Sequence, residues 1–299
     1  MFITSNMMRW WKGLKMNKKR VFLIGNGESR KSFNLNLLKD KGVVYGCNGL
    51  YRDYTPDAIT CVDPGIMHEI YDSGYAKSNT VYYRGWTPIP AMMYDDMVNT
   101  HKQDMKTRLG SEPKIIESEK PEGTQEFVIH GSTALWQKKI LEEERPYKGV
   151  GANIIFISWL HPEDKVRAIS DYQSIGPDMK TGDLGYSAGP TALSIACLVE
   201  KPDEVFLIGC DLYSNSGKFN NMYKGTNHYE REDIDAVIPQ NWLNQYHSTF
   251  LLNSDTDFYK VNEKSHTKGD LVNRKIDEWD DLMNIHYITQ EELINRFLI

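Results

Sequence analysis

The sequence lacks the features that mark secreted, membrane-spanning and nucleic-acid-binding proteins. Its 299 residues include only four cysteines and carry a formal net charge of -6. Duplex nucleic acid is bound by clustered lysine and arginine, which an acidic chain does not supply, so we expect no nucleic-acid partner. The longest apolar run, ANIIFISWL at 152–160, is far shorter than the roughly 18 residues that a membrane span requires.

The few cysteines show no spacing that suits a metal or a redox centre. No CxxC pair occurs, and each cysteine lies inside an apolar run where a small buried side chain fits. We therefore interpret them as core thiols of a protein in a reducing, cytoplasmic compartment. They are Cys47, Cys61, Cys197 and Cys210.

What the chain does contain is a regular alternation of strand-like and helix-like segments. Runs rich in β-branched and aromatic residues lie at 20–25, 42–48, 57–63, 80–86, 152–158, 203–211 and 257–262. Helix-like segments lie between them, at about 31–40, 65–73, 90–104, 133–144, 187–200 and 241–253. Strands that are apolar on both faces are typical of parallel sheets covered by helices on each side. The predicted fold class is α/β, with a Rossmann-like, doubly wound, mostly parallel sheet and a helical and loop insertion.

The domain organisation follows from where this alternation begins and ends. Residues 1–19 hold basic residues and two tryptophans but no apolar core of a signal peptide, so we expect a flexible extension, with Met16 as an alternative start. Peripheral contact of this extension with a membrane surface stays open. Residues 20–265 are expected to form the catalytic domain, with an insertion at about 87–150 that could act as a lid. Residues 266–299 are expected to form a helical tail.

The segment VFLIGNGESR at 21–30 carries the first functional signal. A strand that ends in Gly25-Asn26-Gly27 and opens a helix places backbone N–H groups at the carboxyl edge of a parallel sheet, where nucleotides and other anionic ligands bind. The motif is not a P-loop, and Arg30 stands where a full GxGxxG would have its third glycine. We expect the two glycines to let the backbone approach such a ligand.

Polar residues also end three other predicted strands. Asn48 follows the second strand, Asp63 the third, and Asp211 the strand at 203–211. The carboxyl ends of parallel strands meet at one edge of the sheet, so we expect these side chains to share a ligand site.

The order of these motifs resembles that of a known family. GNGES at 25–29, CNG at 47–49, VDP at 62–64, YSAG at 186–189 and GCDLY at 209–213 are similar to motifs of the metal-independent bacterial lipooligosaccharide sialyltransferases. A more distant resemblance extends to archaeal pterin diphosphokinases and flagellin-modifying glycosyltransferases. The resemblance covers residues 20–262 apart from the insertion.

The resemblance implies a glycosyltransferase that needs neither metal nor resident cofactor. It would move a sugar, sialic-acid-like in the family, from a CMP-linked donor to a hydroxyl group of a glycan acceptor. Tyr213 would donate a hydrogen bond to the leaving phosphate, and Tyr223 would replace a second phosphate-binding tyrosine. The residues expected to bind the donor are Gly25, Asn26, Gly27, Ser29, Asn48, Asp63, Ser187, Gly189 and Tyr223.

The sequence does not identify the general base. In the family that this chain resembles, the catalytic histidine precedes the last core helix, and the corresponding position here falls near Pro239, where no histidine occurs. His228 is the first candidate, since it follows the strand at 203–211 in a loop, and His247 in a helix-like segment is the second. Asp211 is held in reserve. A magnesium-dependent pterin-type diphosphokinase and a non-catalytic nucleotide-binding protein remain as alternatives, and self-association stays open.

Overall fold

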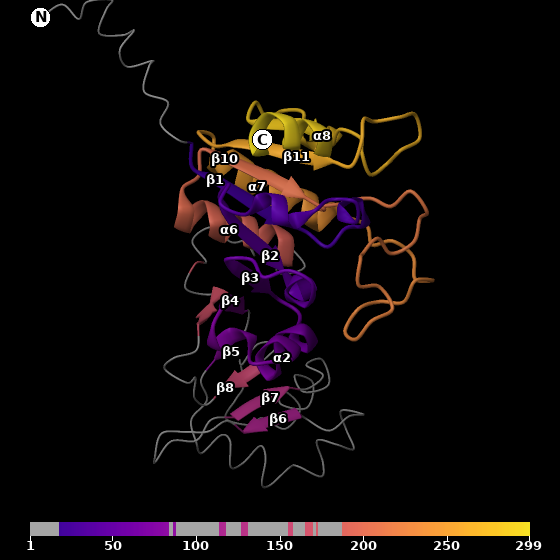
Figure 1. The fold of residues 1–299 in the computed structure, drawn as a ribbon. Helices are drawn as coiled ribbons and strands as arrows, with labels where there is room; N and C mark the ends of the chain where they lie inside the picture. The colour runs from indigo at the N-terminus through magenta and orange to yellow at the C-terminus, as the bar shows by residue number, and fades with distance from the viewer. Residues whose placement is uncertain are drawn as a thin grey trace, which may run out of the picture.

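The computed structural model describes residues 18–83, 165–169, 172 and 187–299, together with the backbone of four short strands at 86–87, 114–117, 127–130 and 155–157. Its main sheet has eight strands, β1 (Arg20–Ile24), β2 (Val43–Cys47), β3 (Ala58–Cys61), β4 (Thr80–Tyr83), β9 (Val166–Ala168), β10 (Glu204–Ile208), β11 (Asp257–Asn262) and β12 (Ile285–Thr289). Every neighbouring pair is parallel, in the order β12-β11-β10-β1-β2-β3-β4-β9 (Figure 1). The predicted Rossmann-like α/β fold is confirmed.

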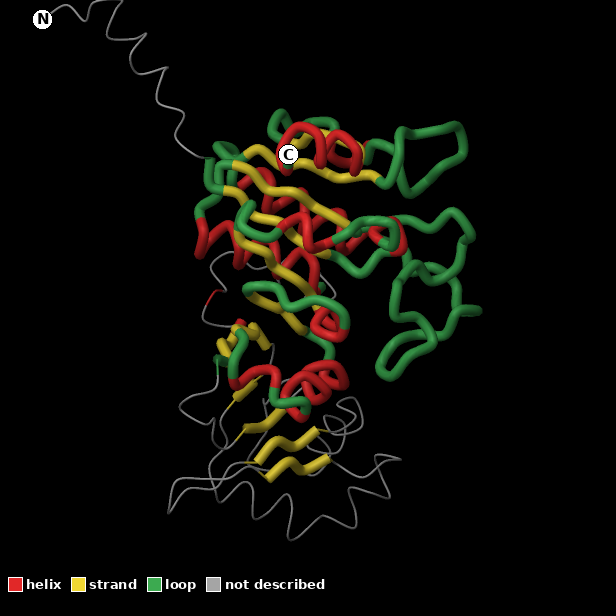
Figure 2. The backbone as a smooth tube through the Cα atoms, viewed as in Figure 1, coloured by secondary structure: helices red, strands yellow, loops and turns green. Residues whose placement is uncertain are grey.

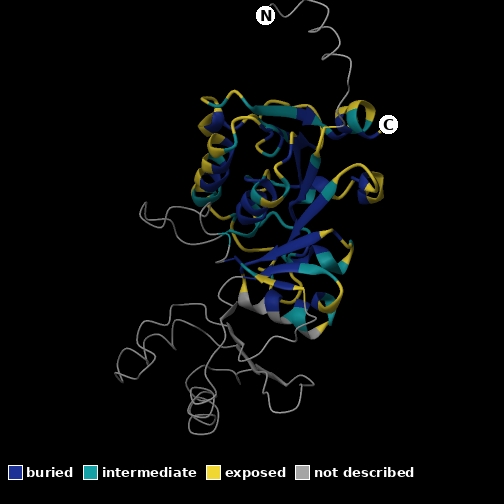
Figure 3. Ribbon diagram, turned by 90° about the vertical axis from the view of Figure 1, so that its left-hand side faces the viewer, coloured by how far each residue is buried: buried dark blue, intermediate teal, exposed yellow. Residues whose placement is uncertain are grey.

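Helices flank this sheet because its strands are apolar on both faces. In β1, Val21 and Leu23 join the core under α6 (Ala188–Glu200) and α7 (Gln240–Leu252). Phe22 and Ile24 point to the opposite core, which includes residues of η2 (Leu35–Leu38), α8 (Gln290–Leu293) and η9 (Ile294–Leu298). A third core lies between β3, β4 and α2 (Pro64–Asp72). The buried strands run through the middle of the molecule in Figure 3.

The strand order contains one point where the direction of winding changes. From β1 the chain proceeds outward through β2, β3 and β4, and it later returns to β10 on the other side of β1 before continuing to β11 and β12. In open α/β sheets, ligands bind outside the carboxyl ends of the strands at such a point. Two long loops, 212–239 and 263–276, lie at this edge of the sheet (Figure 2).

Several expected elements differ from those observed. The helix expected at 31–40 is replaced by two 3₁₀ turns, η1 (Glu28–Arg30) and η2, because the Asn34 side chain accepts the N–H of Asn36 and thereby favours a turn over a continuous helix. The run at 152–158 contains β8 (Ile155–Ile157), but this strand belongs to a second sheet. That sheet has the order β5-β8-β7-β6 and includes β5 (Trp86–Thr87), β6 (Lys114–Glu117) and β7 (Phe127–His130).

The expected insertion therefore contains strands. The helices predicted at 90–104 and 133–144 and the extension at 1–17 lie outside the described residues.

The C-terminal segment also differs from the expected helical tail. Residues 285–289 form β12, which pairs with β11 and extends the main sheet, so this segment is part of the domain. The short α8 follows directly, and a capping box between Thr289 and Glu292 fixes its start. The strand escaped prediction because its residues are only partly buried, which leaves a weak apolar pattern.

The four cysteines are unpaired thiols, as expected of core residues. Cys47, Cys61 and Cys197 are buried and Cys210 is partly buried. Burial raises the pKa of Cys47 to about 12 and that of Cys210 to about 11, so these thiols are neutral at physiological pH. Among the helices that the structure describes, none is both long enough and apolar enough to span a lipid bilayer.

Candidate functional site

A cavity of about 530 Å³, here called the first cavity, opens at the carboxyl ends of β1, β2, β3 and β10. The N-terminus of α6 and the loop at 212–239 complete its wall. Nine of the predicted site residues line it: Gly25, Asn26, Gly27, Asn48, Asp63, Ser187, Gly189, Asp211 and His228. The other three, Ser29, Tyr213 and Tyr223, lie outside the lining.

The glycines of the turn after β1 are needed for contacts within the protein. A Cβ atom on Gly25 would lie 2.3 Å from the carbonyl oxygen of Gly209, and one on Gly27 would lie 2.3 Å from Cγ of Asp211. The close approach is therefore made by the end of β10. This corrects the interpretation that the glycines are needed for the approach of a ligand.

The N–H groups of this turn are also used within the protein. Gly25 and Gly27 donate to carbonyl oxygens at the end of β10, over 2.8 Å in each case. The N–H of Glu28 donates to Asn220 over 2.9 Å, and that of Ser29 donates to Asp211 over 3.0 Å. The turn thus lacks the row of free donors that a phosphate cradle requires.

Asp211, which follows β10, is hydrogen-bonded to the turn after β1. Its carboxylate accepts hydrogen bonds from both the N–H and the hydroxyl of Ser29, the latter over 2.5 Å, and from the Asn220 amide over 3.1 Å. These donors occupy both carboxylate oxygens and favour a structural role over the reserve role as general base. Ser29, a predicted ligand contact, is buried, and its N–H and hydroxyl groups both donate to Asp211.

Two N–H groups at the N-terminus of α6, those of Ala188 and Gly189, have no partner among the described hydrogen bonds, whereas the N–H of Ser187 donates to Gln245 over 3.3 Å and Pro190 has no N–H. Ser187, Ala188, Gly189 and Pro190 all line the first cavity. The first N–H groups of a helix have no partner within it, and Ser187 makes no side-chain cap. This thirteen-residue helix therefore directs its positive end toward the cavity.

Two asparagines in the lining have unsatisfied acceptors. The amide nitrogen of Asn26 donates to the carbonyl oxygen of Cys47 over 3.0 Å, and that of Asn48 donates to Asp63 over 2.9 Å. The Oδ1 atoms of both asparagines are buried without a hydrogen-bond partner. An unsatisfied buried acceptor costs roughly 1–3 kcal/mol, which a donor group on a ligand would recover. Asn48 also has a left-handed backbone, with φ of 49°, which turns the chain sharply at this edge.

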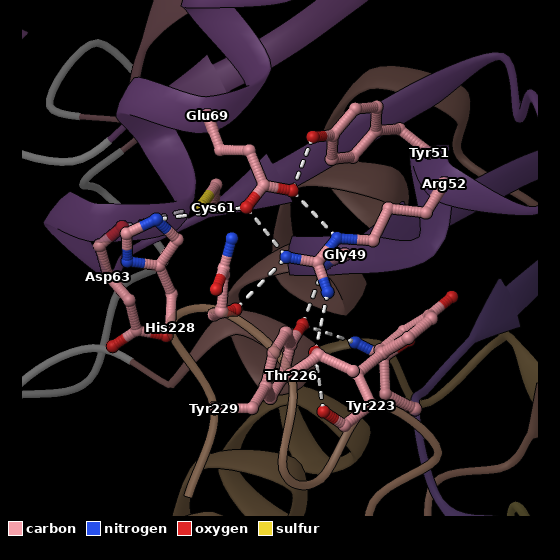
Figure 4. A network of polar contacts seen from close by, with 12 residues as sticks. Gly49, Tyr51, Arg52, Cys61, Asp63, Glu69, Tyr223, Thr226, His228 and Tyr229 are labelled. Atoms are coloured by element: carbon pink, nitrogen blue, oxygen red, sulfur yellow. Dashed lines mark hydrogen bonds and ion pairs between the residues drawn. The ribbon is translucent and has the colours of Figure 1, made fainter.

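His228 lines the cavity from the long loop, and Glu69 on α2 lies behind it (Figure 4). The imidazole Nε2 is 3.7 Å from a carboxylate oxygen of Glu69. Although burial opposes it, hydrogen bonds from Arg52 and Tyr51 lower the pKa of Glu69, so the carboxylate stays ionised. This contact can orient the imidazole.

Arg52 connects the loop at 212–239 to the edge of the sheet through hydrogen bonds. Its guanidinium holds Glu69 through two bonds of 2.7 Å and donates to the hydroxyl of Thr226 and the carbonyl oxygen of Asn227. It also lies over the Tyr229 ring, 5.4 Å from the centroid. The residue before His228 is thus tied to the same arginine as Glu69, which fixes the histidine relative to its partner (Figure 4).

Both predicted phosphate-binding tyrosines have partners outside the first cavity. The ring of Tyr213 lies under the guanidinium of Arg274, 4.6 Å from it, and packs against the core below α6 and α7. Tyr223 is buried and donates to Asp53 over 2.5 Å, while Arg30 donates to the Tyr223 oxygen over 2.9 Å. Arg30, the residue in place of a third glycine, thus anchors the loop, and its side chain is only 2% exposed.

The two histidine candidates occupy different surroundings. His247 lies on α7 with its Nε2 3.0 Å from Asp281, and it is not part of the cavity lining. His228 is 42% exposed and is part of that lining. Of the aromatic residues, Phe219, Tyr229, Trp242 and Tyr246 line the cavity. The sequence gives no signal for Glu69, because its contact with His228 joins residues far apart in the chain.

The charge of the lining is acidic. It includes Asp63, Asp211 and Glu230, and no described lining residue is lysine or arginine. Within the described ranges, no group of three or more His, Cys, Asp or Glu side chains is placed to hold a metal ion.

Comparisons with known proteins add no relative: no protein-family model, no curated protein and no solved structure matches this chain.

Proposed function

We propose that the protein transfers a sugar from a CMP-linked donor to a hydroxyl group of an acceptor glycan. The observation that carries this proposal is a single arrangement: a cavity at the switch point of the sheet with a carboxylate-backed histidine on one wall and unsatisfied amide acceptors on another. Substrate-sized cavities with a few convergent polar groups are typical of such binding sites. The motif order described above supports the same assignment.

The acidic lining favours a donor with little phosphate charge. A CMP-linked sugar has one phosphodiester charge, whereas nucleoside diphosphate sugars and ATP bring more negative charge into a wall without lysine or arginine. The N-terminus of α6 offers free N–H groups and a positive dipole, which suit one phosphate. The unsatisfied oxygens of Asn26 and Asn48 are buried, and they suit the hydroxyl and amino groups of a nucleoside once the two side chains turn toward the cavity on binding.

The chemistry requires one proton acceptor and one stabilised leaving group. His228 takes the proton from the acceptor hydroxyl as its oxygen forms a bond to the anomeric carbon. The bond from that carbon to the phosphate oxygen breaks, and CMP leaves with the electron pair. Glu69 orients the imidazole, and the α6 terminus stabilises the phosphate charge. Tyr213 has no part in this scheme.

The first experiment is thermal stabilisation of the whole chain by CMP, UDP, GDP and ATP, each with EDTA or Mg²⁺. A ligand that binds only the folded state raises the melting temperature. We expect the largest rise with CMP, unchanged by EDTA. A rise only with ATP and Mg²⁺ would favour the diphosphokinase, and no rise with any nucleotide would remove the donor assignment. Tight CMP binding without turnover of CMP-linked sugars would leave a nucleotide-binding protein.

A further inference from the structure

A second cavity, of about 680 Å³, lies at the carboxyl ends of β11 and β12. Its lining includes Asn262 at the end of β11, Thr289 at the end of β12, and most of the loop at 263–276. Because β10 and β11 are neighbours in the sheet, this second cavity follows the first along the same edge. None of its residues belongs to the lining of the first cavity.

Four basic side chains gather around this second cavity. They are Lys264, His266, Arg274 and Lys275. Among the described residues, Lys264, His266 and Lys275 have no ion-pair partner. The Nε atom of Arg274 is buried without a hydrogen-bond partner, and the guanidinium is held in place over the Tyr213 ring.

The carboxylates of this lining are used to build its wall or point to solvent. Asp270, only 8% exposed, accepts hydrogen bonds from Asn215, Val272 and Asn273. Glu292 belongs to the capping box of α8. Asp277, the third carboxylate, is 77% exposed and lies 3.9 Å from Arg274, at the limit of an ion pair. The lining thus holds three carboxylates beside Lys264, Arg274 and Lys275, so its formal charge is balanced, but among the described ion pairs the ammonium groups of Lys264 and Lys275 contact none of these carboxylates.

Hydrogen bonds within the protein hold the wall of this cavity in place. Lys260 is buried on β11 and donates to Asn262 over 2.5 Å and to the carbonyl oxygen of Val272 over 3.0 Å. Asn215 bridges from the neighbouring loop to Asp270 and to the N–H of Leu271. A preformed wall lowers the entropic cost of holding a ligand.

We propose that the second cavity binds the phosphate group of a small phosphorylated molecule. The guanidinium of Arg274 and the ammonium groups of Lys264 and Lys275, the latter 6.0 Å from the Tyr287 ring centroid, place several charged donors around one cavity, which suits a dianion. This site does not depend on the function proposed for the first cavity, because the two linings share no residue.

The test is calorimetric titration of the full chain with inorganic phosphate, pyrophosphate and a sugar 1-phosphate. We expect saturable binding that the double variant Lys264→Gln/Lys275→Gln weakens by about tenfold or more, because it removes two charged hydrogen-bond donors. Lys268→Gln is the matched control, since this exposed lysine of the same loop lies outside the lining, and we expect a loss of less than about twofold. Tighter binding of the sugar 1-phosphate than of inorganic phosphate would indicate that the site binds organic phosphates. Equal binding of the two would indicate that the site binds the free phosphate ion.

Two results would overturn the inference. One is the absence of saturable binding with all three probes at millimolar concentration. The other is an equal loss in Lys268→Gln and in the double variant, which would indicate diffuse surface attraction. Arg274→Gln is a less direct variant because it also removes the contact with Tyr213, so the double lysine variant decides. A failure of CMP to bind would change none of these outcomes.

Discussion

The two cavities lie along one edge of one sheet and differ in chemistry. The first has an acidic lining with unsatisfied amide oxygens and a histidine, and the second has four basic side chains and three carboxylates around a hydrogen-bonded loop. Both cavities lie at the carboxyl ends of parallel strands. Their chemistry therefore differs because of the loops that line them and because of which polar atoms already have hydrogen-bond partners within the protein. A position at the carboxyl edge therefore indicates where ligands bind, and the unused polar groups indicate which ligands fit.

The largest expected effect concerns the histidine that only the first cavity contains. We expect His228→Ala to lower the rate of sugar transfer by about 10² to 10⁴, the usual contribution of a general base, with little change in CMP affinity. Rates of CMP release from a CMP-linked sugar in the presence of acceptor measure the effect. His247→Ala is the matched control, because this histidine pairs with Asp281 outside the cavity. Equal losses in both variants would contradict the assignment of His228.

A second effect tests whether the glycine turn serves the fold. We expect Gly25→Ala to destabilise the protein by about 3 kcal/mol, because the added methyl group would overlap a backbone carbonyl of β10 that cannot move aside. Denaturant unfolding measures the change. Gly217→Ala is the control, since its site is open and only its positive φ, 70°, causes strain, for a cost of about 1 kcal/mol. A fully stable Gly25→Ala variant would show that β10 tolerates more space there.

The sequence predicted six of the eight strands of the main sheet, missing β9 and β12, and it predicted less of the site. Apolar runs such as 20–25 and 203–211 predict buried parallel strands because burial on both faces leaves a strong local pattern. Nine predicted residues line the first cavity because strand ends converge by topology. Which side chains contact one another cannot be predicted from local sequence patterns, because the partners are far apart in the chain. Asp211 binds Ser29, and Tyr213 lies under Arg274. The contact of Glu69 with His228 depends on how the loop at 212–239 folds.

A third effect tests whether Asp270 builds the second cavity. Although burial opposes it, hydrogen bonds from Asn273 and Asn215 lower the pKa of Asp270 to about 2. A depressed pKa contributes stability above the ordinary value of 3.8, and this contribution is lost as the pH falls toward about 2. Asp270→Asn should therefore cost at most about 2 kcal/mol at neutral pH, and the difference from the unchanged protein should shrink below about pH 4.

Unfolding by denaturant at several pH values measures this difference. Asp277→Asn is the control, because this exposed carboxylate of the same cavity makes no contact shorter than 3.9 Å among the described ion pairs, and its replacement should leave the free energy of unfolding nearly unchanged. If Asp270→Asn is as stable as the unchanged protein at neutral pH, then Asp270 does not build the wall. Its charge would then count against a phosphate in the second cavity.

The smallest effect isolates the unsatisfied oxygen of Asn48. Asn48→Gly removes the amide while keeping the left-handed backbone, since glycine adopts a φ of 49° without strain. We expect CMP affinity to fall about tenfold, the value of one hydrogen bond to a buried acceptor. Asp40→Gly is the control, because Asp40 has a similar φ of 61° but lies outside the first cavity, and it should leave CMP affinity unchanged. If Asn48→Gly binds CMP as tightly as the unchanged protein, the unsatisfied oxygen is a cost of the sharp turn at this edge and does not recognise the nucleoside, and the distinction between the two cavities then rests on charge alone.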